Sequence, residues 1–414
     1  MENLCPVVID RTGRDIHEEA ARMRAQGPVA RIELPGGVLA WSITGYDAVM
    51  RALADHRLSK DPRKHWTAFA AGEIGHDFPL IGWALMENLS TAYGSDHSRL
   101  RRLIAKAFTP RRVEAMRSGV EKIAADLLDE LAAAAPDEVV DLKARYAHPL
   151  AARVIGDLIG VPERARAGVL PGSDAHVDTT RTAEDLAADA ERRRREMREL
   201  IEAKRRAPAD DLTTDLISAQ DNGSQLNDTE LLSTLLLLLG TGTEPVTNLV
   251  TNTVRALLIH PGQRELLAAG HVSWEEVIEE TLRAEAPVAH LPFRFAVEDI
   301  EIGGVTIRKG EPVLIAFAAA GRDPAVHGAS ADRFDATRAD KAHLSFGHGI
   351  YRCIGMPLGW METEIALRAL FDRFPGLTLG VPPEEIEGQG TFIMNGCRTL
   401  PVRLNGRDRA RQRV

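Results

Sequence analysis

Residues 346–355 read Phe346-Gly347-His348-Gly349-Ile350-Tyr351-Arg352-Cys353-Ile354-Gly355 and place one cysteine in a glycine-rich turn. Residues 357–374 have a helical pattern, so the cysteine is expected just before a helix begins. Glycines adopt backbone angles that other residues resist, which lets the chain approach a flat cofactor closely. Amides around the sulfur can donate hydrogen bonds to it and tune a bound metal. The stretch therefore favours a thiolate ligand of a metal-containing cofactor, whereas a cysteine in isolation is more often a small buried apolar side chain.

Length and composition are those of a globular protein whose core can bury a cofactor. The chain has 414 residues, of which 44% are hydrophobic and 27% charged. A net charge of −9 argues against a nucleic-acid-binding protein, and no run of about 18 apolar residues predicts a membrane span. Three cysteines are too few for a disulfide framework, and the N-terminus lacks a signal-peptide pattern. We expect a cytoplasmic protein with no nucleic-acid partner and no membrane partner.

Helical patterns dominate the chain, and short strands accompany them. The strands 29–34 and 38–43 flank Pro-Gly-Gly and predict a hairpin, and further strands are expected within 297–316 and near the C-terminus. Residues 61–92 form an irregular segment, and residues 321–352 are rich in coil. We expect a mainly α protein with small β-sheets, and its predicted helices cover 46–54, most of 96–202, 231–258, 274–284 and 357–374.

The cysteine stretch resembles the haem-binding loop of the cytochromes P450. The family pattern is Phe-x-x-Gly-x-(His or Arg)-x-Cys-x-Gly, and Phe346, Gly349, Cys353 and Gly355 match it. Tyr351 departs from it, because the family has a basic residue at this position and tyrosine offers one hydrogen bond and no charge.

The resemblance extends over nearly the entire chain and implies a single cytochrome P450 domain over residues 1–414. It implies haem b as the cofactor and Cys353 as the iron ligand. A thiolate on haem iron favours cleavage of the O–O bond. The loop residues that it places around the haem are Phe346, Gly347, Tyr351 and Gly355.

For two pairs of residues on predicted helices, the family resemblance implies a role that the residues in isolation do not. Glu280 and Arg283 share a helix face at i and i+3, and in isolation they read as a surface pair of little energetic weight. The family buries this pair and joins to it an arginine from a downstream coil, which Asp332-Arg333-Phe334-Asp335 and Arg338 resemble here. His97 and Arg101 likewise read in isolation as part of a solvated basic helix. The resemblance makes them haem-propionate ligands together with Arg294, since arginine bonds to carboxylates are strong and directional.

A set of basic residues is expected near the cysteine side. The resemblance implies that electrons arrive on this face from a ferredoxin or a flavodoxin-like donor, and complementary charge would raise the association rate. The alternative is a scatter of solvated residues. The set comprises Arg99, Arg102, Lys106, Arg111, Arg112 and Arg352.

The helix 231–258 carries glycines and a proline in its interior. Interior glycine costs about 1 kcal/mol and interior proline about 3 kcal/mol, so the segment predicts a distortion that serves a purpose, with a packing kink as the alternative. It resembles the oxygen-binding groove of the family, (Ala or Gly)-Gly-x-(Asp or Glu)-Thr. Gly242 and Glu244 match, and Pro245 replaces the threonine that helps to deliver protons. Glu244 is a candidate proton source, with pairing to a neighbouring residue as the alternative. The carbonyl of Thr241, which loses its amide partner at residue 245, and the Thr241 hydroxyl are candidates to take part of that role.

By family position, substrate enters over residues 61–92 and the helices near 165–200. The expected pocket is mainly apolar, and His290 is its polar candidate, with a structural histidine as the alternative. Each apolar member can equally be part of the core. The expected pocket residues are Trp83, Leu89, Leu238, Val246, Val288, Ala289, His290, Leu291, Phe392 and Ile393.

Two functions of different classes follow from these features. The first is a haem-thiolate monooxygenase that hydroxylates or oxidatively couples a small secondary metabolite with O2 and electrons from a separate donor. The second is a haem protein that binds or senses a ligand without turnover.

Overall fold

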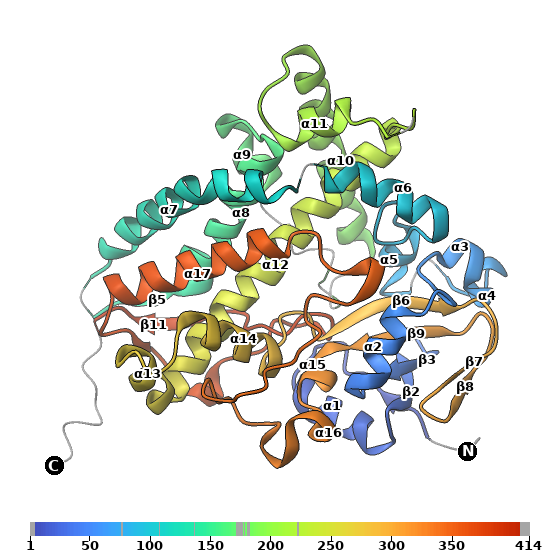
Figure 1. Cartoon of the computed structure of the whole chain (residues 1–414). Helices are drawn as coiled ribbons and strands as arrows, with labels where there is room; N and C mark the ends of the chain where they lie inside the picture. The colour runs from blue at the N-terminus through green and yellow to red at the C-terminus, as the bar shows by residue number, and fades with distance from the viewer. Residues whose placement is uncertain are drawn as a thin grey trace.

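A computed structural model describes residues 5–75, 78–106, 108–135, 137–170, 177, 179, 183–221 and 223–405 of the chain. Helices make up most of this part (Figure 1). They are α1 (Ile16–Ala25), α2 (Tyr46–Ala54), α3 (Pro62–His65), α4 (Thr67–Ala70), α5 (Ile81–Leu85), α6 (Gly94–Ala105), α7 (Pro110–Ala132), the π-helical η1 (Lys143–Ala147), α8 (His148–Ile159), α9 (Glu163–Val169), α10 (Ala183–Arg206), α11 (Leu212–Ser218), α12 (Asp228–Ile259), α13 (Pro261–Ala268), α14 (Trp274–Ala284), α15 (Phe317–Gly321), α16 (Pro324–His327) and α17 (Met356–Arg373).

The strands form three small sheets. The largest has the order β1-β2-β3-β9-β6-β4, the second β10-β11-β5, and the third pairs β7 with β8. Their bounds are β1 (Val7–Val8), β2 (Val29–Leu34), β3 (Val38–Ile43), β4 (Leu58–Ser59), β5 (Val139–Asp141), β6 (His290–Ala296), β7 (Ile300–Ile302), β8 (Val305–Ile307), β9 (Pro312–Ala316), β10 (Thr378–Leu379) and β11 (Pro401–Arg403).

The elements predicted from the sequence are confirmed at nearly the expected bounds. The hairpin pairs Val29 with Ile43 in antiparallel register, and α2 and α14 span the predicted residues. Helix α12 extends the prediction by a few residues, because Asn227 and Glu230 form a capping box that fixes its start. The irregular segment 61–92 contains three short helices, α3, α4 and α5.

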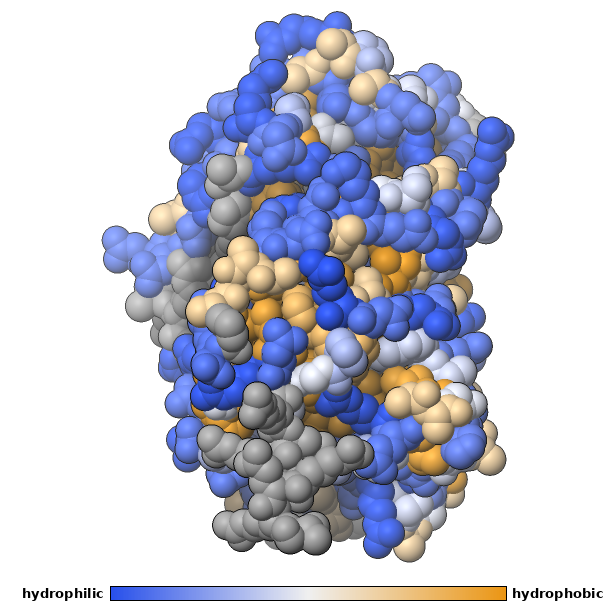
Figure 2. All heavy atoms as spheres, turned by 90° about the vertical axis from the view of Figure 1, so that its left-hand side faces the viewer, coloured by the Kyte–Doolittle hydropathy of each residue, from blue (hydrophilic) through white to orange (hydrophobic). Residues whose placement is uncertain are grey.

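Helix α12 crosses the centre of the molecule, with α7 and α17 on one side and the largest sheet on the other (Figure 1). The main apolar core lies where α7, α8, α12 and α17 meet, and a second core packs beside the sheet. Hydrophilic residues cover most of the face in Figure 2, and apolar residues show only in limited areas between them. No helix among the described residues combines the length and apolarity needed to cross a membrane.

The Glu280–Arg283 pair is buried, as the resemblance implied, and not on the surface. Both side chains are 0% exposed, and two bonds of 2.8 and 2.7 Å join them. Arg283 also donates to the carbonyls of Gly321, Ala331 and Arg333. Arg338 Nε lies 3.6 Å from Glu280 Oε1. The pair therefore ties α14 to the coil that leads to the cysteine loop.

Candidate active site

Positive backbone angles shape the cysteine loop. Gly347 and Gly349 have φ of 71° and 67°, a region that favours glycine. A Cβ at Gly349 would also stand 3.3 Å from the carbonyl oxygen of Leu53 in α2. The Cys353 amide donates to the Phe346 carbonyl at 2.8 Å and closes the loop. The cysteine is thereby held just before α17.

Protein atoms surround the Cys353 thiol, although the residue as a whole is exposed. Burial raises the pKa of its thiol, while the amides of Gly355 and Met356 and the charge of Arg101 act in the opposite direction. These amides and this charge stabilise a thiolate once a cation is bound to it. Among the described residues, no group of three or more His, Cys, Asp or Glu side chains could hold a metal ion.

Basic side chains from three elements converge on the ring of Tyr351. The His97 ring, from α6, lies 4.1 Å from it between centroids, and the Arg294 guanidinium carbon, from β6, lies 4.8 Å from its centroid. Lys60 Nζ, just after β4, is 5.3 Å away. Arg101 belongs to the same cluster, because its charge lowers the pKa of His97. The Tyr351 hydroxyl donates to the Ala92 carbonyl at 3.1 Å and so makes its hydrogen bond within the protein.

This basic cluster has no counter-ion within the described residues. Arg294 is 1% exposed, and none of its three side-chain nitrogens has a hydrogen-bond partner; His97 Nδ1 also lacks one. Burial lowers the pKa of His97 to about 4, and the charges of Lys60, Arg101 and Arg294 add to the effect. Like charges gathered out of water are costly unless an anion joins them. The cluster therefore has the character of a binding site for carboxylates or another anion.

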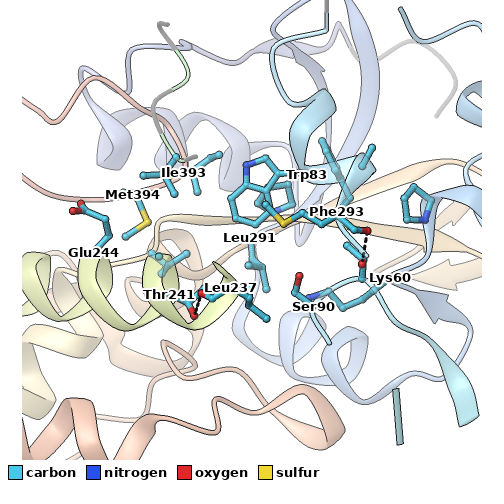
Figure 3. Close-up of a pocket in the computed structure, with 18 of the residues that line it drawn as sticks. Lys60, Trp83, Ser90, Leu237, Thr241, Glu244, Leu291, Phe293, Ile393 and Met394 are labelled. Atoms are coloured by element: carbon cyan, nitrogen blue, oxygen red, sulfur yellow. Dashed lines mark hydrogen bonds between the residues drawn. The ribbon is translucent and has the colours of Figure 1, made fainter. Parts of the chain in front are cut away.

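Helix α12 continues through Pro245 as one uninterrupted helix. Pro245 has no amide hydrogen, so the Thr241 carbonyl lacks its usual partner four residues on. The Thr241 hydroxyl donates to the Leu237 carbonyl at 2.7 Å, so its proton is engaged within the helix while its oxygen can still accept (Figure 3). Thr241 and Pro245 both line the pocket.

Gly242 lies on the opposite side of α12 from the pocket. A Cβ there would stand 2.6 Å from the side chain of Ile155 in α8, so the glycine allows the two helices to pack closely. Gly240 lines the pocket instead, although it was not among the site residues predicted from the sequence.

Glu244 lines the pocket and is held by two residues from other elements. Gln389 Nε2 donates to it at 2.6 Å, and His148 Nδ1 lies 3.4 Å away. Burial alone would raise the pKa of this carboxyl, but the His148 contact and the charge of Lys143 outweigh burial and hold the pKa below its usual value. Glu244 is therefore ionised at neutral pH. His148 is 28% exposed and links this buried carboxylate to solvent.

The pocket beside α12 is mainly apolar, with a few polar groups at its edges. Four of the residues expected from the sequence line it: Trp83, Val288, Leu291 and Ile393. Phe293, Phe295, Ser90 and Thr91 also line it and were missed, as was Lys60. In Figure 3, Glu244 and Lys60 lie on opposite sides of the pocket.

The other expected pocket residues do not line it. His290 is 0% exposed, neither of its ring nitrogens has a partner, and burial lowers its pKa to about 4, so it is a neutral core histidine. The expected entry near 165–200 falls partly outside the described residues. The remaining five pack in the cores: Leu89, Leu238, Val246, Ala289 and Phe392.

The chain is similar to known proteins along nearly its full length. It is 50% identical to a 2-hydroxy-5-methyl-1-naphthoate 7-hydroxylase of Streptomyces carzinostaticus, with 98% of each chain covered. The model of the cytochrome P450 family matches residues 274–396. The chain belongs to the cytochrome P450 family. It is also 39% identical to a 6-deoxyerythronolide B hydroxylase of Saccharopolyspora erythraea, over 95% of this chain and 96% of that protein.

Solved P450 structures share its fold. CYP154A1 from Streptomyces coelicolor A3(2) superposes with a TM-score of 0.90 at 44% identity, covering 96% of this chain and 100% of its own. CYP154C4 from Streptomyces sp. W2061 gives 0.93 at 40% identity, with 97% and 98% covered. The mainly α P450 fold expected from the sequence is confirmed, and the protein is a P450 monooxygenase with a haem cofactor.

The residues present fit this haem. The cysteine at the glycine loop would ligate the iron, and the unpartnered cations of the basic cluster would suit a group with two propionates. The pairing of β6 with β9 shifts register between Leu291, which lines the pocket, and Arg294, which belongs to the basic cluster.

The basic set expected near the cysteine side is largely paired. Four of its members contact acidic residues of other elements, so they do not present free positive charge together: Arg99 with Glu230, Arg102 and Lys106 with Asp221, and Arg112 with Asp215. Exposed pairs of this kind contribute little to stability.

Proposed function

We propose that Cys353 would ligate the iron of haem b and that His97, Arg101 and Arg294 would bind its propionates. The loop residues Phe346, Gly347, Tyr351 and Gly355 then surround the sulfur side of the cofactor. The converging thiolate and unpaired buried cations support these roles. We further propose that residues 1–414 act as one P450 domain.

Bound to a thiolate, haem supplies the activation of O2 for insertion of one oxygen atom into the substrate. The chain's part is to hold the substrate and to bring protons to the pocket. Glu244 is placed for the second task, since it lines the pocket and contacts the partly exposed His148. A proton can pass from solvent to His148 and then to a Glu244 carboxylate oxygen. Gln389 keeps that carboxylate oriented, and Gly242 serves the packing of α12 against α8.

Pro245 stands where the family pattern has a threonine hydroxyl, so proton delivery at this position depends on Thr241 and Glu244. The Pro245→Thr variant is expected to raise the product formed per electron consumed by about twofold or more and to lower peroxide release, because a hydroxyl and an amide hydrogen are added. Parallel measurement of NAD(P)H consumption, product and peroxide tests this. Pro261→Thr, at the first turn of α13, is the control. Unchanged product and peroxide yields in Pro245→Thr would contradict a role for this position.

We infer that the substrate is a small aromatic carboxylic acid and that the reaction is its hydroxylation. The observation that carries this is the 50% identity over 98% of both chains with a protein named as a hydroxylase of a naphthoate. The pocket agrees with that class, because Trp83, Phe293 and Phe295 offer flat apolar surfaces and Lys60 and Ser90 offer polar groups.

Electrons would come from a separate ferredoxin or flavodoxin-like donor in the cytoplasm. Because four basic residues of the expected docking set are paired, Arg111 and Arg352 are the members that remain for such a donor.

The substrate class is tested by titrating the haem-loaded protein with hydroxynaphthoic acids and with their methyl esters. An acid of the right shape should shift the iron from low to high spin and be hydroxylated when a ferredoxin and its reductase are added. The ester should bind about 10-fold more weakly or worse, because it lacks the charge. Equal binding of acid and ester, or no spin shift with any aromatic acid, would contradict the proposed class.

A further inference from the structure

Lys60 follows β4, which pairs antiparallel with β6 through Ser59 and Phe295. This pairing brings Lys60 next to the strand that carries Arg294, although the two residues are far apart in the sequence. Its side chain is buried at 8% exposure. The neighbouring carboxylate, Asp61, accepts from the amides of Arg63 and Lys64 at the start of α3 and does not pair with Lys60.

Lys60 has no hydrogen bond and no ion pair within the described part of the chain. Its Nζ lies over the face of the Tyr351 ring, 5.3 Å from the ring centroid. Burial, with a smaller contribution from Arg294, lowers its pKa to about 7. An ammonium held out of water without a partner is unfavourable, so an anion beside Lys60 would recover this cost.

Lys60 lies between the pocket and the basic cluster around Tyr351. It lines the pocket together with Ser90, and Figure 3 shows both side chains at the same edge of it. It also faces the basic cluster around Tyr351, none of whose other members lines the pocket. Arg101 and Arg294 are two fixed charges and match the two carboxylates of a haem. Lys60 is a third cation at the same place, and Tyr351 beneath it brings no charge.

We propose that Lys60 is a carboxylate-binding residue at the boundary between the propionate cluster and the substrate pocket. The carboxylate has two sources, a haem propionate or the acid group of a substrate. Binding of a substrate carboxylate rests on the proposed function, whereas binding of a propionate does not.

The test compares Lys60→Met, which keeps the length of the side chain and removes the charge, with Lys60→Arg, which keeps the charge. Lys64→Met is the matched control, since Lys64 is 58% exposed and belongs to the adjoining α3. The first readout is the rate of haem transfer to excess apomyoglobin in substrate-free protein. The second is the ratio of the dissociation constants of a hydroxynaphthoic acid and its methyl ester, from the spin shift.

If the partner is a propionate, Lys60→Met should lose haem about 10-fold faster than wild type, with the acid-to-ester ratio unchanged. If the partner is the substrate, haem loss should be unchanged and the preference for the acid should fall about 10-fold, with ester binding intact. Lys60→Arg keeps the charge and should therefore behave largely like wild type in both readouts. Haem loss and an acid-to-ester ratio that both match those of Lys64→Met would overturn the assignment. If wild type binds the acid no more tightly than the ester, only the proposed substrate class is contradicted. The rate of haem loss would then still decide whether Lys60 binds a carboxylate.

Discussion

Replacement of Cys353 by alanine is expected to abolish oxygenation and to remove the long-wavelength Soret band that marks a thiolate-ligated, CO-bound ferrous haem. Alanine has no atom that can bind iron, and the other two cysteines, Cys5 and Cys397, lie outside this loop. The loop itself should survive, because its closing bond runs between the amide of residue 353 and the Phe346 carbonyl. A CO difference spectrum of the variant reconstituted with haem checks the result.

Cys5→Ser is the matched control, because Cys5 is exposed and far from the loop in sequence. Its spectrum and turnover should equal those of wild type. A Cys353→Ala protein that keeps the thiolate-type band would show that another residue binds the iron.

Replacement of Glu280 by alanine is expected to lower the free energy of unfolding by about 3–5 kcal/mol. The variant leaves the Arg283 guanidinium charged, fully buried and without its carboxylate partner. It also removes the acceptor for the Asp335 amide, which now donates to Glu280 at 2.8 Å. Chemical denaturation of the haem-loaded variant and wild type measures the difference.

Glu114→Ala provides the comparison, since Glu114 pairs with Arg117 at the same i and i+3 spacing on an exposed face of α7. Its loss should cost no more than about 0.5 kcal/mol. If both variants lose the same free energy of unfolding, burial does not strengthen the Glu280–Arg283 pair, and the pair does not stabilise the fold as proposed.

Local motifs in the sequence predicted the fold well, because each motif carries its own geometry. The 346–355 stretch has glycines where positive φ is required, and the helix 274–284 has its capping residues in place. Burial of the Glu280–Arg283 pair could not be derived from its spacing, which is the same in exposed pairs. It followed only from the family resemblance.

The pocket was predicted less well, since its lining depends on helix rotation and strand pairing. Gly240 and Gly242 lie two residues apart on α12, and only Gly240 faces the pocket while Gly242 packs on Ile155. Lys60 carried no local signal at all. Its proximity to Arg294 arises from the pairing of β4 with β6, and no local sequence motif predicts that pairing.

The most direct test of the central claim is the mass of the product formed under dioxygen labelled with heavy oxygen. The haem-loaded protein, a ferredoxin, its reductase and an aromatic acid that shifts the spin state are incubated together. We predict a hydroxylated acid that carries one labelled oxygen atom, because a P450 monooxygenase inserts a single atom from O2. A thiolate-ligated haem with no labelled product from any acid that binds would contradict the account and identify a haem protein that binds its ligand without turnover.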